Sequence, residues 1–167
     1  MHDELTQVDL DKMKQELTHR IQTLRPKLIE EVQEARAHGD LSENFEYRCA
    51  KQAKNRNDSR IRYLQAMVRT AKVITIDSDN DAIGLFDTVT VYNSVLKKEQ
   101  ILRIVTTLRQ NVLQGLISKE SPAGVALLGK QVGDIVTVTP EGRPSYTMEV
   151  RHIQKGTDDD SLDIAKY

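Results

Sequence analysis

The chain has few of the residues from which a large hydrophobic core is built. Its 167 residues include no tryptophan, and aromatic residues make up only 4% of the sequence. Hydrophobic residues account for 38% and charged residues for 29%, which is a polar balance for a compact domain. A chain of this length forms one ordinary domain or two small ones. We therefore expect a long, surface-rich helical element and a small domain.

Other absences exclude whole classes of protein. A single cysteine excludes an internal disulfide and a cluster of thiolate metal ligands. No apolar run approaches the ~20 residues that a membrane-spanning helix needs, so we expect no membrane partner. The opening residues, MHDELTQVDL, are polar and acidic, unlike a signal peptide, and predict a cytoplasmic protein. A net charge of -1 gives no overall basic field for nucleic acid, so the distribution of charge matters instead.

Apolar residues with helical spacing fill the first part of the chain. They recur in steps of three and four, which places them on one stripe of a helix: Leu10, Met13, Leu17, Ile21, Leu24, Leu28, Val32 and Ala35. Pro26 lies inside this pattern and removes one backbone donor, which predicts a local kink. Gly39 ends the pattern, and Asp40 or Ser42 is a natural cap for a second helix.

A second run has the same spacing. Its members are Ala50, Ala53, Asn57, Ile61, Leu64, Val68, Ala71 and Ile74. Asn57 is a polar residue on this stripe and could fix the register of two packed helices. Each run of about 30 residues would give a helix of about 45 Å. Because neither run has a second apolar face, an antiparallel hairpin over residues 1–76 is favoured over two helices folded onto a larger core.

The second half of the chain has the pattern of a small α+β domain. A polar, acidic linker over 77–83 precedes a domain over 84–155, and 156–167 forms an acidic tail that we expect to be mobile. Within the domain, Ser121 is the expected cap of a short helix whose first residue is Pro122. Alternating or β-branched segments predict five strands, at 87–92, 101–108, 115–118, 135–138 and 146–153.

Two carboxylates stand at the predicted hairpin tip. Asp40 and Glu43 are three residues apart at a helix start, so both can face the same way. Together they could share a hard cation such as Mg²⁺. The alternative is structural, with Asp40 capping the helix and Glu43 completing a capping box. Because a tip cannot enclose a metal, a catalytic role would need a partner that completes the site.

Basic residues are concentrated on the second helix. They are Arg48, Lys51, Lys54, Arg56, Arg60, Arg62, Arg69 and Lys72. The first helix near the tip is acidic instead, with Glu30, Glu31 and Glu34. One interpretation is a pair of helices exchanging salt bridges, each worth ~0–1 kcal/mol on a surface. The other is a stripe that contacts nucleic-acid phosphates behind an acidic tip.

The tip and the second domain carry two separate family motifs. The tip stretch EARAHGDLSENFEY, residues 34–47, resembles the tip of the bacterial Gre transcript-cleavage factors, as does Arg25-Pro26 upstream. In the second half, ISKESP at 117–122 and ALLGK at 126–130 resemble the C-terminal domain of the same family, as does VGD at 132–134. The resemblance covers roughly Leu10 to Ile153.

This resemblance implies an α+β protein: an N-terminal antiparallel coiled coil followed by an FKBP-like domain. Such factors act as monomers, have no active site alone and bind no cofactor alone. The globular domain docks at the rim of the RNA polymerase secondary channel, and Glu120, Ser121 and Pro122 match the docking loop. The coiled coil reaches down the channel, where the complex stimulates cleavage of nascent RNA.

The resemblance also assigns roles to the tip. Asp40 and Glu43 match the two acids that help hold a Mg²⁺ ion shared with the polymerase, which activates water. Arg48, Lys51 and Lys54 match the basic side that meets the 3′ end of the nascent RNA.

The sequence departs from the family pattern at two places. Phe45 stands where a small residue is common, and Arg109 and Gln110 stand where a glycine and an acidic stretch are frequent. Some members of the family occupy the channel without promoting cleavage, so a channel binder that only modulates polymerase is the alternative function. A third, weaker alternative function is that of a prolyl isomerase. That activity needs a pocket rich in aromatic residues, and this chain has few.

Overall fold

The protein has a helical part and a β-rich part. The structure is a computed structural model that describes residues 4–39, 44–75, 81–158 and 161–164. It divides the chain into two units. The first is the helical hairpin Leu10–Lys72, and the second combines Glu4–Asp9 with the chain from Val73 onward. The predicted α+β class, with a helical hairpin before a small sheet domain, is confirmed.

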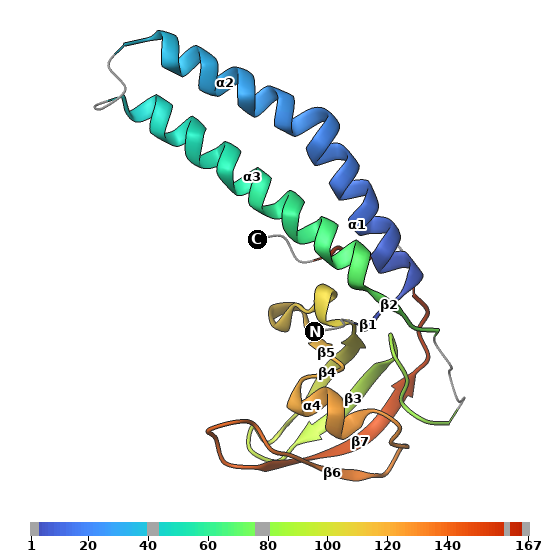
Figure 1. Cartoon of the computed structure of the whole chain (residues 1–167). Helices are drawn as coiled ribbons and strands as arrows, with labels where there is room; N and C mark the ends of the chain where they lie inside the picture. The colour runs from blue at the N-terminus through green and yellow to red at the C-terminus, as the bar shows by residue number, and fades with distance from the viewer. Residues whose placement is uncertain (1–3, 40–43, 76–80, 159–160, 165–167) are drawn as a thin grey trace. The chain divides into compact units, whose positions relative to one another are not determined.

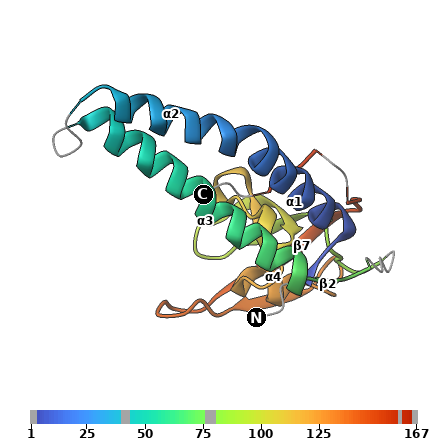
Figure 2. The same cartoon turned by 45° about the horizontal axis from the view of Figure 1, so that its top comes forward.

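The first unit is an antiparallel pair of long helical segments. Helix α1 (Gln7–His19) continues through the segment Arg20–Leu24 into α2 (Arg25–Ala37). Helix α3 (Phe45–Thr70) returns along them, and Figures 1 and 2 both show α2 and α3 side by side. The 26 residues of α3 span about 39 Å at 1.5 Å per residue.

A π-helical turn interrupts the first helical segment just before Pro26. It covers Arg20–Leu24 and closes with a hydrogen bond from the Arg25 amide to the Arg20 carbonyl. Pro26 has no amide hydrogen for the carbonyl of Gln22, and in a regular helix its ring would clash with that carbonyl. A wider turn accommodates both defects. The irregularity expected at the proline therefore takes the form of a π turn.

The apolar stripes meet inside the hairpin, with one exception. Among the described residues of this unit, six apolar side chains are buried: Met13, Leu28, Ala35, Ile61, Leu64 and Met67. Ile21 was expected on the stripe but is 37% exposed. It lies in the π turn, which changes the angle per residue, and Arg20 takes the inward position by bonding Asn57 instead. Helix α3 ends at Thr70, before the last two expected members of its stripe, Ala71 and Ile74.

The second unit is built on a five-stranded sheet. Its strands are β3 (Thr88–Asn93), β4 (Lys98–Val105), β5 (Leu116–Ser118), β6 (Ile135–Val138) and β7 (Tyr146–Gln154). They lie in the order β5-β4-β3-β7-β6, and only the β4–β5 pair is parallel (Figure 1). A bulge between Thr90 and Val91 shifts the register of β3 against β7. Two short strands, β1 (Glu4–Leu5) and β2 (Lys72–Val73), form a separate pair.

Alternation along β3 places every second side chain in the core of this unit. Val89 and Val91 are fully buried, whereas Thr88 and Thr90 are half-buried. The short helix α4 (Pro122–Leu127) contributes Leu127 to the same core. The remaining buried members are Ile83, Leu102, Ile104, Val136, Val138, Met148 and Val150.

The ends of the second unit differ from the limits that the sequence predicts. Ile83 was placed in the linker 77–83, but it is buried, and its amide bonds the Lys130 carbonyl at 2.8 Å. The segment Glu4–Asp9 was placed with the hairpin, yet it groups with the sheet unit, where the Leu5 carbonyl accepts from Ile74. Backbone pairing and core burial decide membership here, and neither is visible in a polarity pattern.

The described residues of the tail 156–167, which the sequence predicts to be mobile, make specific contacts with other residues of the second unit. The Gly156 amide donates to Asp87 Oδ1 at 2.9 Å, and the Asp158 carboxylate pairs with Arg109. Ile164 is 7% exposed. The mobility of this tail stays a prediction, but Asp158 pairs with a buried cation, and Leu162 packs against buried apolar residues.

Candidate functional site

The acids predicted to carry the chemistry, Asp40 and Glu43, lie outside the described residues. The structure defines both flanks of that tip, with α2 and the turn after it on one side and Asn44 on the other. The Gly39 φ of 137° lies in the region that favours glycine, so the turn needs this residue.

Asn44 fixes the far flank of the tip with two hydrogen bonds. Its Oδ1 accepts from the Tyr47 amide at 3.0 Å, which makes Asn44 the N-cap of α3. Its Nδ2 donates to the Ala35 carbonyl at 2.8 Å, which ties α3 to α2. The prediction that Asp40 or Ser42 caps this helix is therefore wrong, as is the capping box with Glu43. An ionised carboxylate can only accept at a cap, whereas the Asn44 amide group also donates across the hairpin.

Phe45 follows the cap and points an apolar ring toward solvent. It is 69% exposed, and Glu46 beside it is also exposed. An exposed ring of this size next to a polar tip is available for contact with a partner.

The basic residues Arg48, Lys51 and Lys54 follow on α3. Lys54 pairs with Asp58 at 2.8 Å, and Lys51 lies 5.8 Å from the centre of the Tyr47 ring. Arg48 and Lys51 form no ion pair within the described part of the chain. The helices do exchange salt bridges, but not through the acids near the tip, Glu30, Glu31 and Glu34, that the sequence suggested. Among the described residues, no acid therefore neutralises Arg48 or Lys51.

A charged network inside the hairpin was not anticipated. Glu16 accepts from Arg60 through both oxygens, at 3.0 and 2.9 Å, and from Arg20 Nε at 2.7 Å. Asn57, the polar residue expected to set the register, is buried and accepts from Arg20 at 3.0 Å. Only the spacing of Glu16 and Arg20, four residues apart, could have signalled this cluster.

The network perturbs the carboxylate at its centre. Burial alone would raise the pKa of Glu16, but hydrogen bonds and positive charge from Arg60 and Arg20 outweigh it, so its pKa lies below 4.5. Glu16 is thus held in its ionised form, and its charge orders both arginines.

The predicted docking loop is a tightly bonded turn between β5 and α4. Ser121 is the N-cap of α4, with Oγ accepting from the Gly124 amide at 3.0 Å, and Pro122 begins the helix. Both predictions are confirmed. The Ser118 side chain accepts from the Glu120 amide at 3.1 Å, while Glu120 and Pro122 remain exposed. The loop therefore presents an acid and a proline on a fixed backbone.

The chain around α4 also carries exposed apolar side chains that sequence reasoning did not single out. They are Val125, Leu128, Val132 and Ile135, between 41% and 72% exposed. Helix α4 contacts β6, the strand that contains the last of these. Exposed apolar groups on one short stretch suit a contact with another protein.

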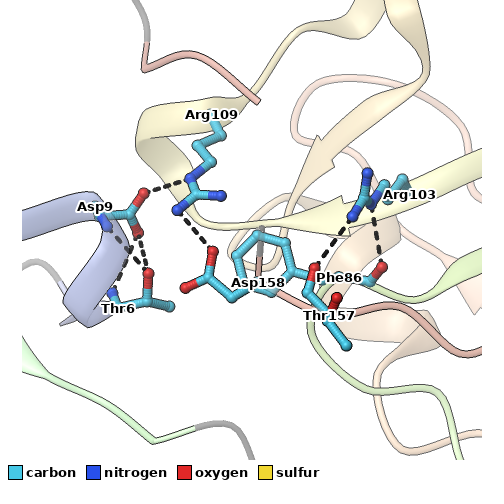
Figure 3. A network of polar contacts seen from close by, with 7 residues as sticks. All are labelled: Thr6, Asp9, Phe86, Arg103, Arg109, Thr157 and Asp158. Atoms are coloured by element: carbon cyan, nitrogen blue, oxygen red, sulfur yellow. Dashed lines mark hydrogen bonds and ion pairs between the residues drawn. The ribbon is translucent and has the colours of Figure 1, made fainter. Parts of the chain in front are cut away.

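Arg109, noted as a departure in the sequence, is fully buried in the second unit. Its Nε donates to Asp9 Oδ1 at 2.5 Å, and its Nη2 lies 2.7 Å from Asp158 Oδ1 (Figure 3). Asp9 in turn accepts from the amide and hydroxyl of Thr6. The guanidinium also stacks 5.0 Å from the centre of the Phe86 ring. Arg109 thus binds both ends of the second unit and is not exposed for docking.

No group of three or more metal-ligating side chains occurs within the described ranges. Among the helices of the described residues, none is long and apolar enough to cross a membrane.

Both halves of the chain match profiles of known protein families. A family profile described as "Transcription elongation factor, N-terminal" matches residues 4–73, and one described as "Transcription elongation factor, GreA/GreB, C-term" matches residues 78–155. The transcription elongation factors GreA of Brucella canis and Brucella abortus are 42% identical over 144 residues, covering 85% of this chain and 92% of theirs.

Solved structures similar to this one include Gfh1 of Thermus thermophilus. It is 26% identical, with a TM-score of 0.43, and the match covers 93% of this chain and 100% of that one. A GreA/GreB factor of Nitrosomonas europaea is 21% identical, with a TM-score of 0.40 and coverage of 57% and 79%. Both family profiles, in order and over nearly the whole chain, show that this protein belongs to the GreA/GreB family of transcription elongation factors.

Proposed function

We propose that this transcription elongation factor stimulates cleavage of nascent RNA by bacterial RNA polymerase in backtracked complexes. It does so by inserting its hairpin into the secondary channel. The catalytic centre belongs to the polymerase, and the chain acts on it as a monomer. The relatives named GreA, at 42% identity, support this proposal for the whole chain.

The observation that carries the proposal is the way Asn44 fastens the tip. It starts α3 directly after the two acids and bonds α2 across the hairpin. A helix of about 39 Å behind it makes a narrow probe long enough to reach a recessed centre. In the sequence, Asp40 and Glu43 directly precede this braced helix.

The chemistry of these two acids suits Mg²⁺. Carboxylate oxygens are ligands that this ion prefers, and it commonly retains waters and takes few protein ligands. We propose that Asp40 and Glu43 hold a Mg²⁺ shared with the polymerase. Such an ion supplies activation of water for attack on a phosphodiester. The role of the hairpin is to carry and orient the two carboxylates.

The proposal includes two further contacts, one with the polymerase rim and one with RNA. Glu120, Ser121 and Pro122 would dock the second unit at the channel rim, with the exposed apolar residues near α4 supplying buried area. Arg48, Lys51 and Lys54 would meet phosphates at the 3′ end of the displaced RNA.

A cleavage assay on a stalled, backtracked elongation complex tests the proposal. We expect the wild-type chain to accelerate cleavage and the Asp40→Asn/Glu43→Gln double variant to lose that effect while still binding polymerase. Glu46→Gln is the matched control, because Glu46 is an exposed acid at the start of α3. A wild-type chain that binds but leaves the cleavage rate unchanged would instead support the alternative, a channel binder that modulates polymerase.

A further inference from the structure

A groove of about 860 Å³ lies along the hairpin beside the π turn. Its volume falls within the range of small-molecule sites in proteins. Three arginines line it, Arg20, Arg56 and Arg60, and its lining includes no acidic side chain. One acid, Glu16, is shared by two of these arginines, Arg20 and Arg60, and Arg56 adds a further positive charge.

The groove contains a buried donor without an acceptor. Asn57 is 3% exposed, and its Oδ1 must face Arg20 because an arginine can only donate. That orientation leaves Nδ2 buried with no hydrogen-bond partner among the described residues. An unsatisfied buried donor is costly, and an anion in the groove would satisfy it. Arg56, on the rim, forms no ion pair in the part of the chain that the structure describes.

The rest of the lining is not built for a bare anion. Leu24, Leu28 and Ala53 give the groove an apolar floor, and Tyr63 adds a ring beside the Arg60 guanidinium, 5.2 Å from its centre. Polar uncharged side chains complete the lining: Gln52, Asn55 and Ser59. Apolar surface, hydroxyl-binding groups and cations together suit a ligand that has a flat ring, a sugar and several phosphates.

We propose that this groove is a binding site for a nucleoside polyphosphate. The phosphates meet Arg20, Arg56 and Asn57, and the base lies on the apolar floor. None of the residues proposed to contact RNA, Arg48, Lys51 and Lys54, lines the groove. It therefore does not depend on the tip or on the RNA contact proposed above.

Titration calorimetry of the full chain tests the site, with GTP, guanosine, tripolyphosphate and a single-stranded oligoribonucleotide as probes. We expect GTP to bind at least tenfold more tightly than guanosine or tripolyphosphate. Arg56→Gln should weaken GTP binding about tenfold, the loss of one charge-assisted contact. Arg62→Gln is the matched control, because it removes the same charge from an exposed position outside the groove. The Asn57 side-chain amide resonance should shift on addition of GTP.

Four outcomes would overturn the proposal. GTP does not bind; tripolyphosphate binds as tightly as GTP, which indicates a general anion effect; Arg62→Gln loses as much affinity as Arg56→Gln; or the oligoribonucleotide binds and GTP does not. Because Arg56 is exposed and without an ion pair, its variant should fold normally, which a thermal melt confirms.

Discussion

Arg109 and Asp9 are 100 residues apart in the chain, yet they form an ion pair in which both side chains are fully buried. Asp158, near the other end of the second unit, approaches the same guanidinium. One buried cation thus holds two carboxylates that come from opposite ends of the sequence. Removing it would leave a fully buried acid, Asp9, and a largely buried one, Asp158, without their charge partner.

We predict that Arg109→Met destabilises the protein by about 3–5 kcal/mol, the cost of breaking a buried ion pair by removing one partner. Urea unfolding followed by circular dichroism measures this loss. Arg151→Met is the control, because Arg151 pairs with Glu99 on the surface and should matter little. Equal losses of stability in the two variants would mean that the buried ion pair contributes no more than the exposed one.

Glu16 makes the stability of the hairpin depend on pH. Its pKa is lower in the folded protein than its ordinary value of 4.5. Such a group stabilises the fold above the unfolded pKa, and the stabilisation disappears as the pH falls through the folded pKa. We expect the wild-type protein to have a higher melting temperature than Glu16→Gln at pH 7. This difference in melting temperature should disappear below pH 4.5. Ellipticity at 222 nm follows the unfolding of the hairpin, since most of the helical residues lie there.

The control for this experiment is Glu30→Gln, because Glu30 is exposed and its substitution leaves the network intact. A gap between wild type and Glu16→Gln that stays constant with pH would contradict the role assigned to its ionisation.

Asn44 can be dissected by two substitutions. Asn44→Asp keeps an acceptor for the Tyr47 amide but loses the donor to Ala35, whereas Asn44→Ala loses both. We expect the alanine variant to lose about 1–2 kcal/mol of stability and the aspartate variant to lose less. Chemical unfolding of both variants measures the two contributions. Identical losses would show that the cross-hairpin bond, not the cap, dominates.

Gly124 sets the shape of the proposed docking loop. A Cβ at this position would lie 2.1 Å from the Ser118 carbonyl oxygen, so Gly124→Ala must displace the loop or α4. We expect weaker binding to polymerase in a pull-down or titration, with hairpin helicity unchanged. Gly84→Ala, whose Cβ would meet nothing closer than 3.4 Å, is the matched control. Unaltered binding by Gly124→Ala would move the docking surface elsewhere.

Neutralising Arg48, Lys51 and Lys54 should weaken cleavage most in complexes backtracked by many nucleotides. More displaced RNA then lies in the channel, and the effect should shrink at high salt because phosphate contacts act partly through counterion release. Gel assays on short and long backtracks measure the difference. Uniform loss on both, together with a lowered melting point, would instead indicate a structural role for these residues.

The regular parts of this fold follow from the sequence because their signals are local. Helical spacing placed the hairpin, and Ser121-Pro122 placed the start of α4, because a cap and a first-turn proline act within one turn. Pro26 predicted an irregularity in the helix. That it is a π turn depends on which backbone carbonyls can still accept a hydrogen bond.

The misses arise where long-range contacts decide. The sequence marks Arg109 only as a departure from the family pattern, and nothing near it in sequence shows that it will be buried with Asp9 and Asp158. The same holds for Arg60, which reaches Glu16 across 44 residues. Such pairs depend on tertiary packing, which a residue pattern read along the chain does not contain.

The grouping of Glu4–Asp9 with the sheet has a consequence for synthesis on the ribosome. The chain starts the second unit, leaves it to build the whole hairpin, and returns to finish it, so the hairpin is topologically an insertion. Asp9 emerges long before Arg109, and at about 5–20 residues per second it waits roughly 5–20 s for its partner. During that interval the hairpin can form first, because its contacts are complete once α3 has been made. The second unit therefore stays incomplete until its last residues are made, because the cation that pairs with Asp9 also pairs with Asp158.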